Sequence, residues 1–136
     1  MSYRTRFPVR FGDVDSAGIV YYPRYLHYCH VAMEEFFREV VGVDYPRSLA
    51  ELDFGLPAVH LETDFKAPLR YGDVAEVEAK VVELGRTSLT WEYTFYRLGQ
   101  PEPLARARVV TVGLKMKSFE KAEIPAWLRE RVAAEP

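Results

Sequence analysis

Two acidic residues stand two positions apart in the segment that precedes the first amphipathic stretch of the chain. Asp13 and Asp15 are followed by small residues at positions 16–18 and then by a helix start near Pro23. The first N–H groups of a helix have no intrahelical acceptor, and the helix dipole adds partial positive charge there. A carboxylate held near such groups could attack a carbonyl carbon, or activate water, while a backbone amide polarises the carbonyl oxygen. The spacing therefore suits either attack on a carbonyl group or activation of water.

The same residues also have a purely structural interpretation. Aspartate side chains in loops commonly accept hydrogen bonds from nearby backbone N–H groups. Gly18 could simply satisfy a turn that requires a positive φ. The residue types alone leave both interpretations of Asp13 and Asp15 open.

A long amphipathic helix is predicted directly after this loop. Pro23 suits its first turn, and Gly42 suits the position just past its end. Between them apolar residues recur every three or four positions, which indicates a helix of about five turns. These residues are Tyr25, Tyr28, Cys29, Ala32, Met33, Phe36, Phe37, Val40 and Val41. A capping-box pattern at 48–51 predicts a second, short helix that starts there.

Apolar and polar residues alternate in five segments, which predicts five strands. The first is 3–11, where Pro8 favours a position at the edge of the sheet. Four more follow the helix at 59–66, 74–84, 89–95 and 104–117, and a terminal helix is predicted to open at Pro125. Short turn signals separate the later strands and favour antiparallel neighbours.

These elements predict an α+β fold: a single domain over residues 1–136, in which a five-stranded antiparallel sheet wraps around one long central helix. The apolar face of the helix is wide enough to require that cover. Such a sheet has exposed edges, which are normally paired or covered in native proteins. We therefore expect a homo-oligomer that forms through the sheet.

Composition excludes several classes of protein. A formal net charge of -2 and a pI of about 5.9 argue against a general nucleic-acid surface. No apolar stretch approaches the length of a membrane span, and the first 11 residues lack a signal-peptide apolar region, which predicts a cytoplasmic location. A single cysteine excludes a multi-cysteine zinc site, and no metal-ligand pattern is visible. The absence of Asn and an excess of Arg over Lys are features found in thermophile proteins.

Residues 11–25 read Phe-Gly-Asp-Val-Asp-Ser-Ala-Gly-Ile-Val-Tyr-Tyr-Pro-Arg-Tyr. This segment resembles the signature of the 4-hydroxybenzoyl-CoA thioesterase family, hotdog-fold acyl-CoA thioesterases that include the YbgC-like enzymes. The family pattern, F-x-D-x-D-x-x-G-x-V-[YW]-[YH]-x-x-Y, is matched throughout, and the predicted order of elements is also the hotdog order. The resemblance implies hydrolysis of an acyl- or aroyl-CoA to free acid and CoA, with no cofactor, because CoA is part of the substrate.

The resemblance also implies roles for residues of this loop. Asp15 corresponds to the catalytic carboxylate, and the backbone N–H of Tyr22 to the group that polarises the thioester carbonyl. Many YbgC-like relatives have His at the latter position, so Tyr22 places the chain nearer the aryl-CoA branch. Asp13 and Gly18 are interpreted as residues that hold the loop.

CoA binding is implied at a second place, the turn between two predicted strands. Arg86 and Ser88 match basic and hydroxyl positions that contact the CoA phosphates in relatives, and Thr87 stands where aryl-CoA relatives can have a basic residue. In such folds the active site lies between two subunits. The resemblance therefore implies that a dimer is the minimal unit and that a tetramer forms from two dimers.

Other candidates on the central helix receive simpler interpretations. His27 and His30 are interpreted as packing or surface residues, and Cys29 as a core residue. Another hotdog branch supplies its carboxylate from the helix, but with Asp15 present Glu34 and Glu35 suit a solvated face or a subunit contact. Two alternatives remain open: a hotdog hydratase or dehydratase, which characteristically pairs His with an acid, and an acyl-CoA-binding protein without turnover.

Overall fold

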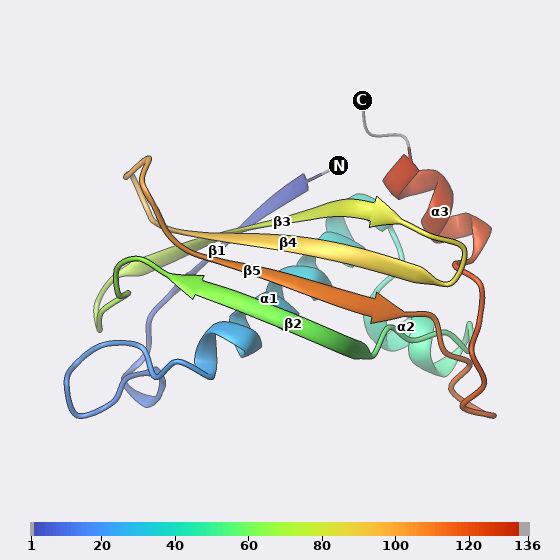
Figure 1. The fold of residues 1–136 in the computed structure, drawn as a ribbon, viewed down its shortest axis with the longest axis horizontal. Coiled ribbons are helices and arrows are strands. Elements are labelled where there is room, and N and C mark those ends of the chain that lie inside the picture. The colour runs from blue at the N-terminus through green and yellow to red at the C-terminus, as the bar shows by residue number, and fades with distance from the viewer. Residues whose placement is uncertain (1, 134–136) are drawn as a thin grey trace.

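A computed structural model describes residues 2–133 and shows a curved sheet with one long helix across its face (Figure 1). Strand β1 (Ser2–Pro8) leads through a 3₁₀ turn (Phe11–Asp13) and a loop to α1 (Arg24–Phe36). A π-helical turn (Phe37–Val41) extends α1, and the short α2 (Tyr45–Ala50) follows. The remaining elements are β2 (Ala58–Phe65), β3 (Val74–Leu84), β4 (Ser88–Arg97), β5 (Pro103–Val112) and α3 (Ala126–Ala133).

The sheet has the strand order β1-β3-β4-β5-β2, and every neighbouring pair is antiparallel. β1 lies at one edge, as Pro8 predicted, and β2 lies at the other. The predicted five-stranded antiparallel sheet and its central helix are confirmed. β1 pairs with β3, although α1 lies between them in sequence. The loop that connects β1 to α1 therefore starts from one end of the sheet.

Helix α1 is continuous over the predicted segment because its apolar face is buried against the sheet. Phe36 is fully buried, and its ring meets the buried Trp91 of β4 edge-on at 5.0 Å between centroids. Gly42 ends the helix with φ +81°, a left-handed conformation that favours glycine, and its N–H donates to Phe37 O at 2.8 Å. No helix within residues 2–133 is long and apolar enough to cross a membrane.

Strand β2 is an exposed edge that carries apolar side chains. Within the described residues its ladder runs to β5 alone, with Leu61 opposite Val109 and Phe65 opposite Ala105. Leu61 is 45% exposed and Phe65 is 50% exposed, although both share the inner face with buried residues of β5. An apolar strand that is unpaired along one side is an association surface.

Two predicted strands are longer than the observed ones. The first ends at Pro8 rather than at residue 11, because Phe11 opens the 3₁₀ turn. The last ends at Val112 rather than at residue 117, because the chain leaves the sheet at Gly113. A Cβ atom at Gly113 would lie 2.3 Å from Ala122 O, so this position packs directly against another backbone segment. Contacts of this kind cannot be predicted from the alternation of apolar and polar residues along a strand.

The predicted second, short helix is present as α2, but the capping box predicted at its start is wrong, and the predicted terminal helix is confirmed. Helix α2 begins at Tyr45, so Ser48 lies inside it and is fully buried. Its hydroxyl donates to Phe54 O at 2.7 Å instead of capping a helix. Helix α3 does open at Pro125, whose carbonyl accepts the N–H groups of Leu128 and Arg129.

Candidate active site

The loop between β1 and α1 folds back on itself at one end of the sheet. Val14 pairs with Val20, and the Asp15 N–H donates to Ile19 O at 3.0 Å. In the turn between Asp15 and Ile19, the Gly18 N–H donates a hydrogen bond to Asp15 O at 2.9 Å, and Gly18 has φ +78°. A side chain at this φ would be strained, so the turn requires glycine.

The connection between β2 and β3 holds this loop in place. The Val20 N–H donates to Leu69 O at 2.9 Å, and the Tyr71 N–H donates to Gly18 O at 3.2 Å. Leu69 itself is fully buried. The loop is therefore supported along its length by the fixed backbone of a neighbouring segment.

Asp13 joins the loop to the body of α1. Its Oδ2 accepts the Arg10 N–H at 3.0 Å and the Tyr28 hydroxyl at 2.9 Å, and Arg24 Nε lies 3.8 Å from Oδ1. Burial and the hydrogen bond to Asp13 raise the pKa of Tyr28, so its hydroxyl remains a donor at neutral pH. With both oxygens engaged, Asp13 is placed to fix the loop.

Asp15 differs from Asp13 in exposure and in the number of its contacts. Its Oδ1 accepts the Ala17 N–H at 2.9 Å, which orients the carboxylate across the turn. The side chain is exposed, and within residues 2–133 Oδ2 has no hydrogen-bond partner. One carboxylate oxygen is thus held while the other is free to act on a substrate.

An unused backbone donor lies at the start of α1. The N–H groups of Arg24, Tyr25 and Leu26 donate to the carbonyls of Tyr21, Tyr22 and Pro23 respectively. Pro23 has no N–H, and within the described part of the chain the Tyr22 N–H has no acceptor. This N–H is a free donor at the positive end of the helix dipole, where a developing oxyanion is stabilised.

An open cavity of about 280 Å³ borders this donor. Its lining includes Ile19, Tyr22, Tyr25 and the segment Phe65–Pro68, so it lies between the loop and the end of β2. The ring of Tyr25 meets that of Phe65 edge-on at 5.0 Å, and its hydroxyl accepts the Leu69 N–H at 3.1 Å. Sequence analysis did not select Phe65 or Lys66, because nothing local connects the end of β2 with the loop before α1.

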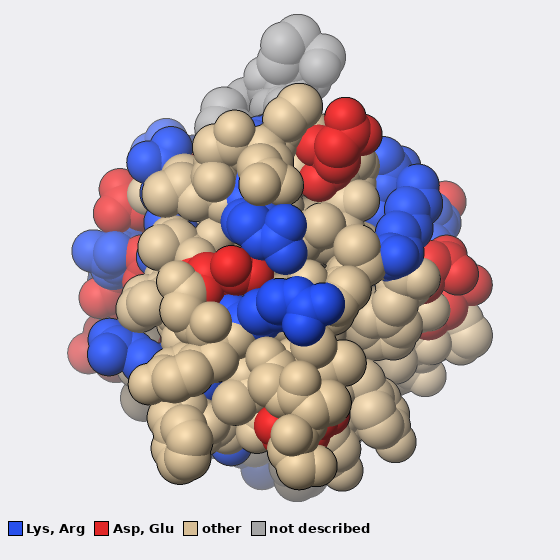
Figure 2. Space-filling view, turned by 90° about the vertical axis from the view of Figure 1, so that its left-hand side faces the viewer, with Lys and Arg blue, Asp and Glu red and all other residues tan. Residues whose placement is uncertain are grey.

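Aromatic side chains dominate the surface of this loop. Phe11 is 77% exposed and meets Tyr71 edge-on at 5.8 Å, and Tyr21 and Tyr22 are exposed as well. The end of the molecule that carries the loop shows mostly uncharged surface, with small groups of basic and acidic side chains (Figure 2). The exposed carboxylate of Asp15 therefore belongs to a loop that also exposes the aromatic rings of Phe11, Tyr21 and Tyr22.

The predicted CoA-binding turn lies at the opposite end of the sheet (Figure 1). β3 runs from the loop end to this turn, and its 11 residues span about 36 Å at a rise of ~3.3 Å per residue. Arg86 Nη1 donates to Glu123 Oε1 at 2.7 Å in an exposed ion pair. The structure thus brings Asp13, Asp15, Gly18 and Tyr22 into one loop, and leaves Arg86, Thr87 and Ser88 far from it within one chain.

The remaining candidates lie on α1. Cys29 is buried, as predicted, and burial raises the pKa of its thiol, which keeps it neutral and unreactive. His30 Nδ1 lies 2.8 Å from Glu34 Oε2, and Glu35 pairs with Arg38 on the exposed side. Within residues 2–133 no three His, Cys, Asp or Glu side chains are grouped to hold a metal ion.

Comparisons with known proteins identify the class. A model of the thioesterase-like superfamily matches residues 9–132. A 1,4-dihydroxy-2-naphthoyl-CoA hydrolase of Synechococcus elongatus is 30% identical over 129 residues, which are 94% of this chain and 93% of that protein. A 1,4-dihydroxy-2-naphthoyl-CoA thioesterase structure from Synechocystis has a TM-score of 0.89 at 25% identity, with both chains covered fully. A 4-hydroxybenzoyl-CoA thioesterase mutant in complex with 4-hydroxybenzoyl-CoA has a TM-score of 0.86 at 25% identity and coverage of 96% and 98%.

Fold and relatives together define an acyl- or aroyl-CoA thioesterase with the hotdog fold. The chain belongs to the thioesterase-like superfamily. The resemblance drawn from residues 11–25 is thereby confirmed.

The hydrogen bond between Tyr28 and Asp13 makes a prediction about stability. Tyr28→Phe should lower the free energy of unfolding by about 1.5–3 kcal/mol, the usual contribution of a hydrogen bond to a charged group. An unfolded tyrosine ionises near pH 10. Since the pKa of folded Tyr28 is raised, the unfolded state loses its proton first, and the contribution of Tyr28 is present below about pH 10 and lost above it.

Urea denaturation at pH 7 and between pH 9 and 11 measures both effects. The loss of stability on the alkaline side should be less steep in Tyr28→Phe than in the wild type. Tyr71→Phe, at an exposed ring, is the matched control. Equal behaviour of the two variants would contradict the importance of the Asp13 contact.

Proposed function

We propose that the protein hydrolyses an aroyl- or acyl-CoA thioester with Asp15 as the reacting carboxylate and the Tyr22 N–H as the donor to the carbonyl oxygen. The observation that carries this proposal is the pairing, in one short loop, of a carboxylate with a free oxygen and a backbone N–H without an acceptor. Asp13 and Gly18 support the reaction only by holding the loop. The reaction is proposed to take place in the cytoplasm.

The chemistry follows from these two groups. The thioester carbonyl accepts the Tyr22 N–H, and negative charge that develops on its oxygen is stabilised there. Asp15 then either attacks the carbonyl carbon, which forms a mixed anhydride and releases the CoA thiolate, or takes a proton from an attacking water. In the first case water hydrolyses the anhydride in a second step. Both routes end in free acid and CoA.

The names of the relatives support an aromatic acyl group. The similar proteins are a 1,4-dihydroxy-2-naphthoyl-CoA hydrolase and thioesterase and a 4-hydroxybenzoyl-CoA thioesterase, all of which take aromatic acyl groups. The cavity beside Tyr22, which an acyl group held at the Tyr22 N–H would enter first, has aromatic walls that suit the same class. We therefore propose an aroyl-CoA as the preferred substrate, with aliphatic acyl-CoA esters as poorer ones.

Replacement of Asp15 tests the mechanism. Asp15→Asn keeps the size of the side chain and its hydrogen bond to Ala17 but removes nucleophilicity and basicity, so kcat should fall by about 10²–10⁴. Asp13→Asn is the matched variant, and it should lower stability by about 1 kcal/mol while reducing kcat less. Thiol release and thermal melting of both variants, measured together, separate the two roles.

Three outcomes would contradict this assignment. Near-wild-type turnover in Asp15→Asn would exclude this mechanism. A larger loss of kcat in Asp13→Asn than in Asp15→Asn would assign the catalytic role to Asp13. Loss of crotonyl-CoA absorbance without thiol release would indicate a hydratase. A single turnover in ¹⁸O water distinguishes the two routes through Asp15, because only the anhydride can leave label in the Asp15 peptide.

The distance between the loop and the Arg86 turn bears on CoA binding. One chain holds them at opposite ends of β3, so a single CoA that uses both must contact two subunits. Antiparallel pairing of β2 with β2 of a second copy reverses the direction of the sheet and brings opposite ends together. We propose a dimer of this kind as the minimal active unit, a tetramer as the complete assembly, and Arg86, Thr87 and Ser88 as CoA contacts.

Arg86 has to exchange its partner to bind a phosphate. The pair with Glu123 is exposed, and exposed pairs contribute little to stability, so a phosphate can displace the carboxylate. Arg86→Ala should raise KM by about tenfold, or roughly 1.4 kcal/mol, at low salt and by less at high salt. Glu123→Gln should lower KM, because it removes the competing carboxylate. Lys80→Ala, which removes a cation from the same strand pair, is the control, and equal KM values in all of these variants would exclude Arg86.

Assembly is tested at the exposed edge. Val59 of β2 is 60% exposed, and Val59→Lys should weaken the dimer by placing a charge where two apolar strands meet. Sedimentation and thiol release are measured over a dilution series of wild type and variant. Activity should fall with the dimer in both series, at higher protein concentration in the variant. A fully active monomer contradicts the proposal.

A further inference from the structure

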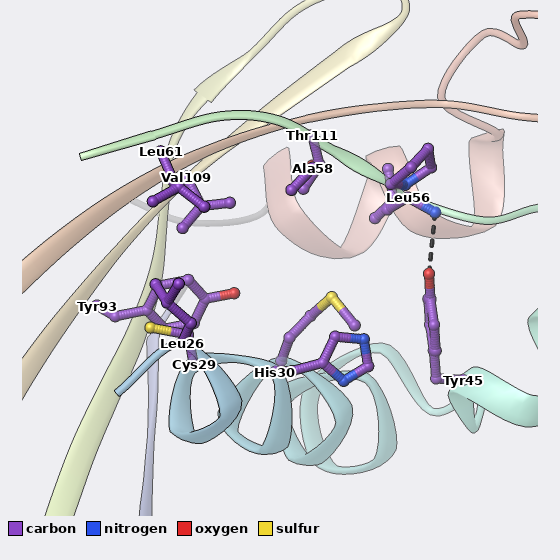
Figure 3. A pocket seen from close by; sticks show the side chains of 12 residues that line it. Leu26, Cys29, His30, Tyr45, Leu56, Ala58, Leu61, Tyr93, Val109 and Thr111 are labelled. Atoms are coloured by element: carbon purple, nitrogen blue, oxygen red, sulfur yellow. Dashed lines mark hydrogen bonds between the residues drawn. The ribbon is translucent and has the colours of Figure 1, made fainter. Parts of the chain in front are cut away.

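A second cavity lies farther along α1, between the helix and the sheet (Figure 3). Its volume is about 260 Å³, well above the ~150 Å³ of an apolar protein cavity that binds benzene. Leu26, Cys29 and Met33 of α1 form one wall, while Leu61 of β2 and Val109 of β5 belong to the other. The space is therefore large enough for an aromatic ring with substituents, and its walls are mainly apolar.

Four tyrosines are buried in this protein, and their hydroxyl groups can be compared directly. The Tyr25 hydroxyl accepts the Leu69 N–H, the Tyr28 hydroxyl donates to Asp13, and the Tyr45 hydroxyl accepts the Leu56 N–H at 2.9 Å. Tyr93 is the exception. Its side chain is 3% exposed, and within residues 2–133 its hydroxyl has no hydrogen-bond partner, although the oxygen itself is not fully enclosed.

The unpaired hydroxyl of Tyr93 faces the cavity. The Tyr93 side chain enters from β4, and its oxygen is directed into the space between α1 and β2 (Figure 3). Its ring stacks on that of Trp91 at 6.0 Å and an interplanar angle of 12°, which fixes its direction. Burial raises the pKa of Tyr93, so the group is a neutral hydroxyl that can donate and accept.

Neighbouring polar groups show that this part of the core otherwise satisfies its hydrogen bonds. Trp91 Nε1 donates to Thr111 Oγ1 at 3.2 Å, and Thr111 Oγ1 donates to Leu89 O at 2.6 Å. Within the described residues the Thr5 hydroxyl is fully enclosed and unpaired, but it is on β1 and does not line this cavity. The Tyr93 oxygen is instead accessible from the cavity, so a molecule that fills the cavity without offering it a hydrogen bond would leave the hydroxyl unpaired at an energetic cost.

We propose that the Tyr93 hydroxyl forms a hydrogen bond with a ring hydroxyl of the substrate's acyl group and thereby determines specificity for hydroxylated aroyl groups. This inference rests on the proposed function, which places the thioester carbonyl at the Tyr22 N–H. Leu26 is one helical turn beyond Tyr22, so an acyl group held at Tyr22 can extend along α1 into the cavity. Cys29, which lines the same cavity as Tyr93, is seven residues beyond Tyr22, about 10 Å along the helix axis. The ring hydroxyl is then on the side of the ring remote from the thioester.

Tyr93→Phe tests this proposal because it removes one oxygen atom and keeps the ring. The values of kcat/KM are measured for benzoyl-CoA and for its 2-, 3- and 4-hydroxy derivatives. The wild type should prefer a 3- or 4-hydroxy ester to benzoyl-CoA by tenfold or more, because a polar site discriminates strongly against an analogue that lacks the matching group. In Tyr93→Phe this preference should fall at least tenfold, while the value for benzoyl-CoA changes less than twofold.

Tyr96→Phe is the matched control on the same strand. Tyr96 lies three residues from Tyr93, so its side chain is on the opposite face of the sheet, where Arg4 stacks on its ring at 4.6 Å. This variant should keep the preference of the wild type. An equal loss on all four esters in Tyr93→Phe, or an unchanged preference, would overturn the proposal.

Two further measurements separate this proposal from its alternatives. Calorimetry with benzoate and the hydroxybenzoates tests recognition without turnover, so it remains informative if no ester releases thiol and the proposed function fails. Wild type should bind the preferred hydroxybenzoate more tightly than benzoate, and Tyr93→Phe should bind the two equally. The melting temperature of the free variant should equal or exceed that of the wild type. A lower melting temperature with unchanged preference would assign the hydroxyl to a structural hydrogen bond through buried water instead.

Discussion

The apolar face of α1 has to be buried, and the position of the site follows from how the sheet buries it. Contacts such as that between Phe36 and Trp91 fix the axis of the helix. Since α1 begins two residues after Tyr22, the same contacts determine where its free N–H lies. The Tyr28 hydroxyl extends this order to the loop, because it bonds to Asp13 from the helix. The packing of the core therefore also determines the geometry of the loop.

Local patterns account for the parts of the structure that depend on local physics. The period of the apolar residues predicted α1 and the strands, Pro8 predicted an edge, and Gly42 predicted the end of the helix. Ser48 and the segment after Val112 were predicted wrongly, because each is decided by a contact outside its own helix or strand, with Phe54 in one case and with Ala122 in the other. A hydroxyl or a glycine has the same local appearance with and without such a partner.

The candidate site divides in the same way. Asp13, Asp15, Gly18 and Tyr22 are close in sequence, so a motif can point to all of them at once. Tyr93 is different, because alternation along β4 places it on the buried face but does not show whether its hydroxyl finds a partner. Only the three-dimensional arrangement distinguishes it from Tyr25, Tyr28 and Tyr45, whose hydroxyl groups support the scaffold. A hydroxyl that the fold leaves without a partner on a cavity wall is the signal that the sequence could not provide.

Strand β2 contributes both to the lining of the two cavities and to a free edge of the sheet. Its inner face contributes Ala58 and Leu61 to the cavity along α1 and Phe65 to the cavity beside Tyr22, while its outer edge has no neighbour within the described chain. A substitution at Leu61 that reshapes the cavity also changes a side chain of the free edge. A substitution at Leu26 or Met33 changes the cavity from the helix side and leaves that edge as it is. During evolution, substitutions on α1 can therefore change the substrate range with little effect on association between subunits. Substitutions on β2 change the substrate range and association together.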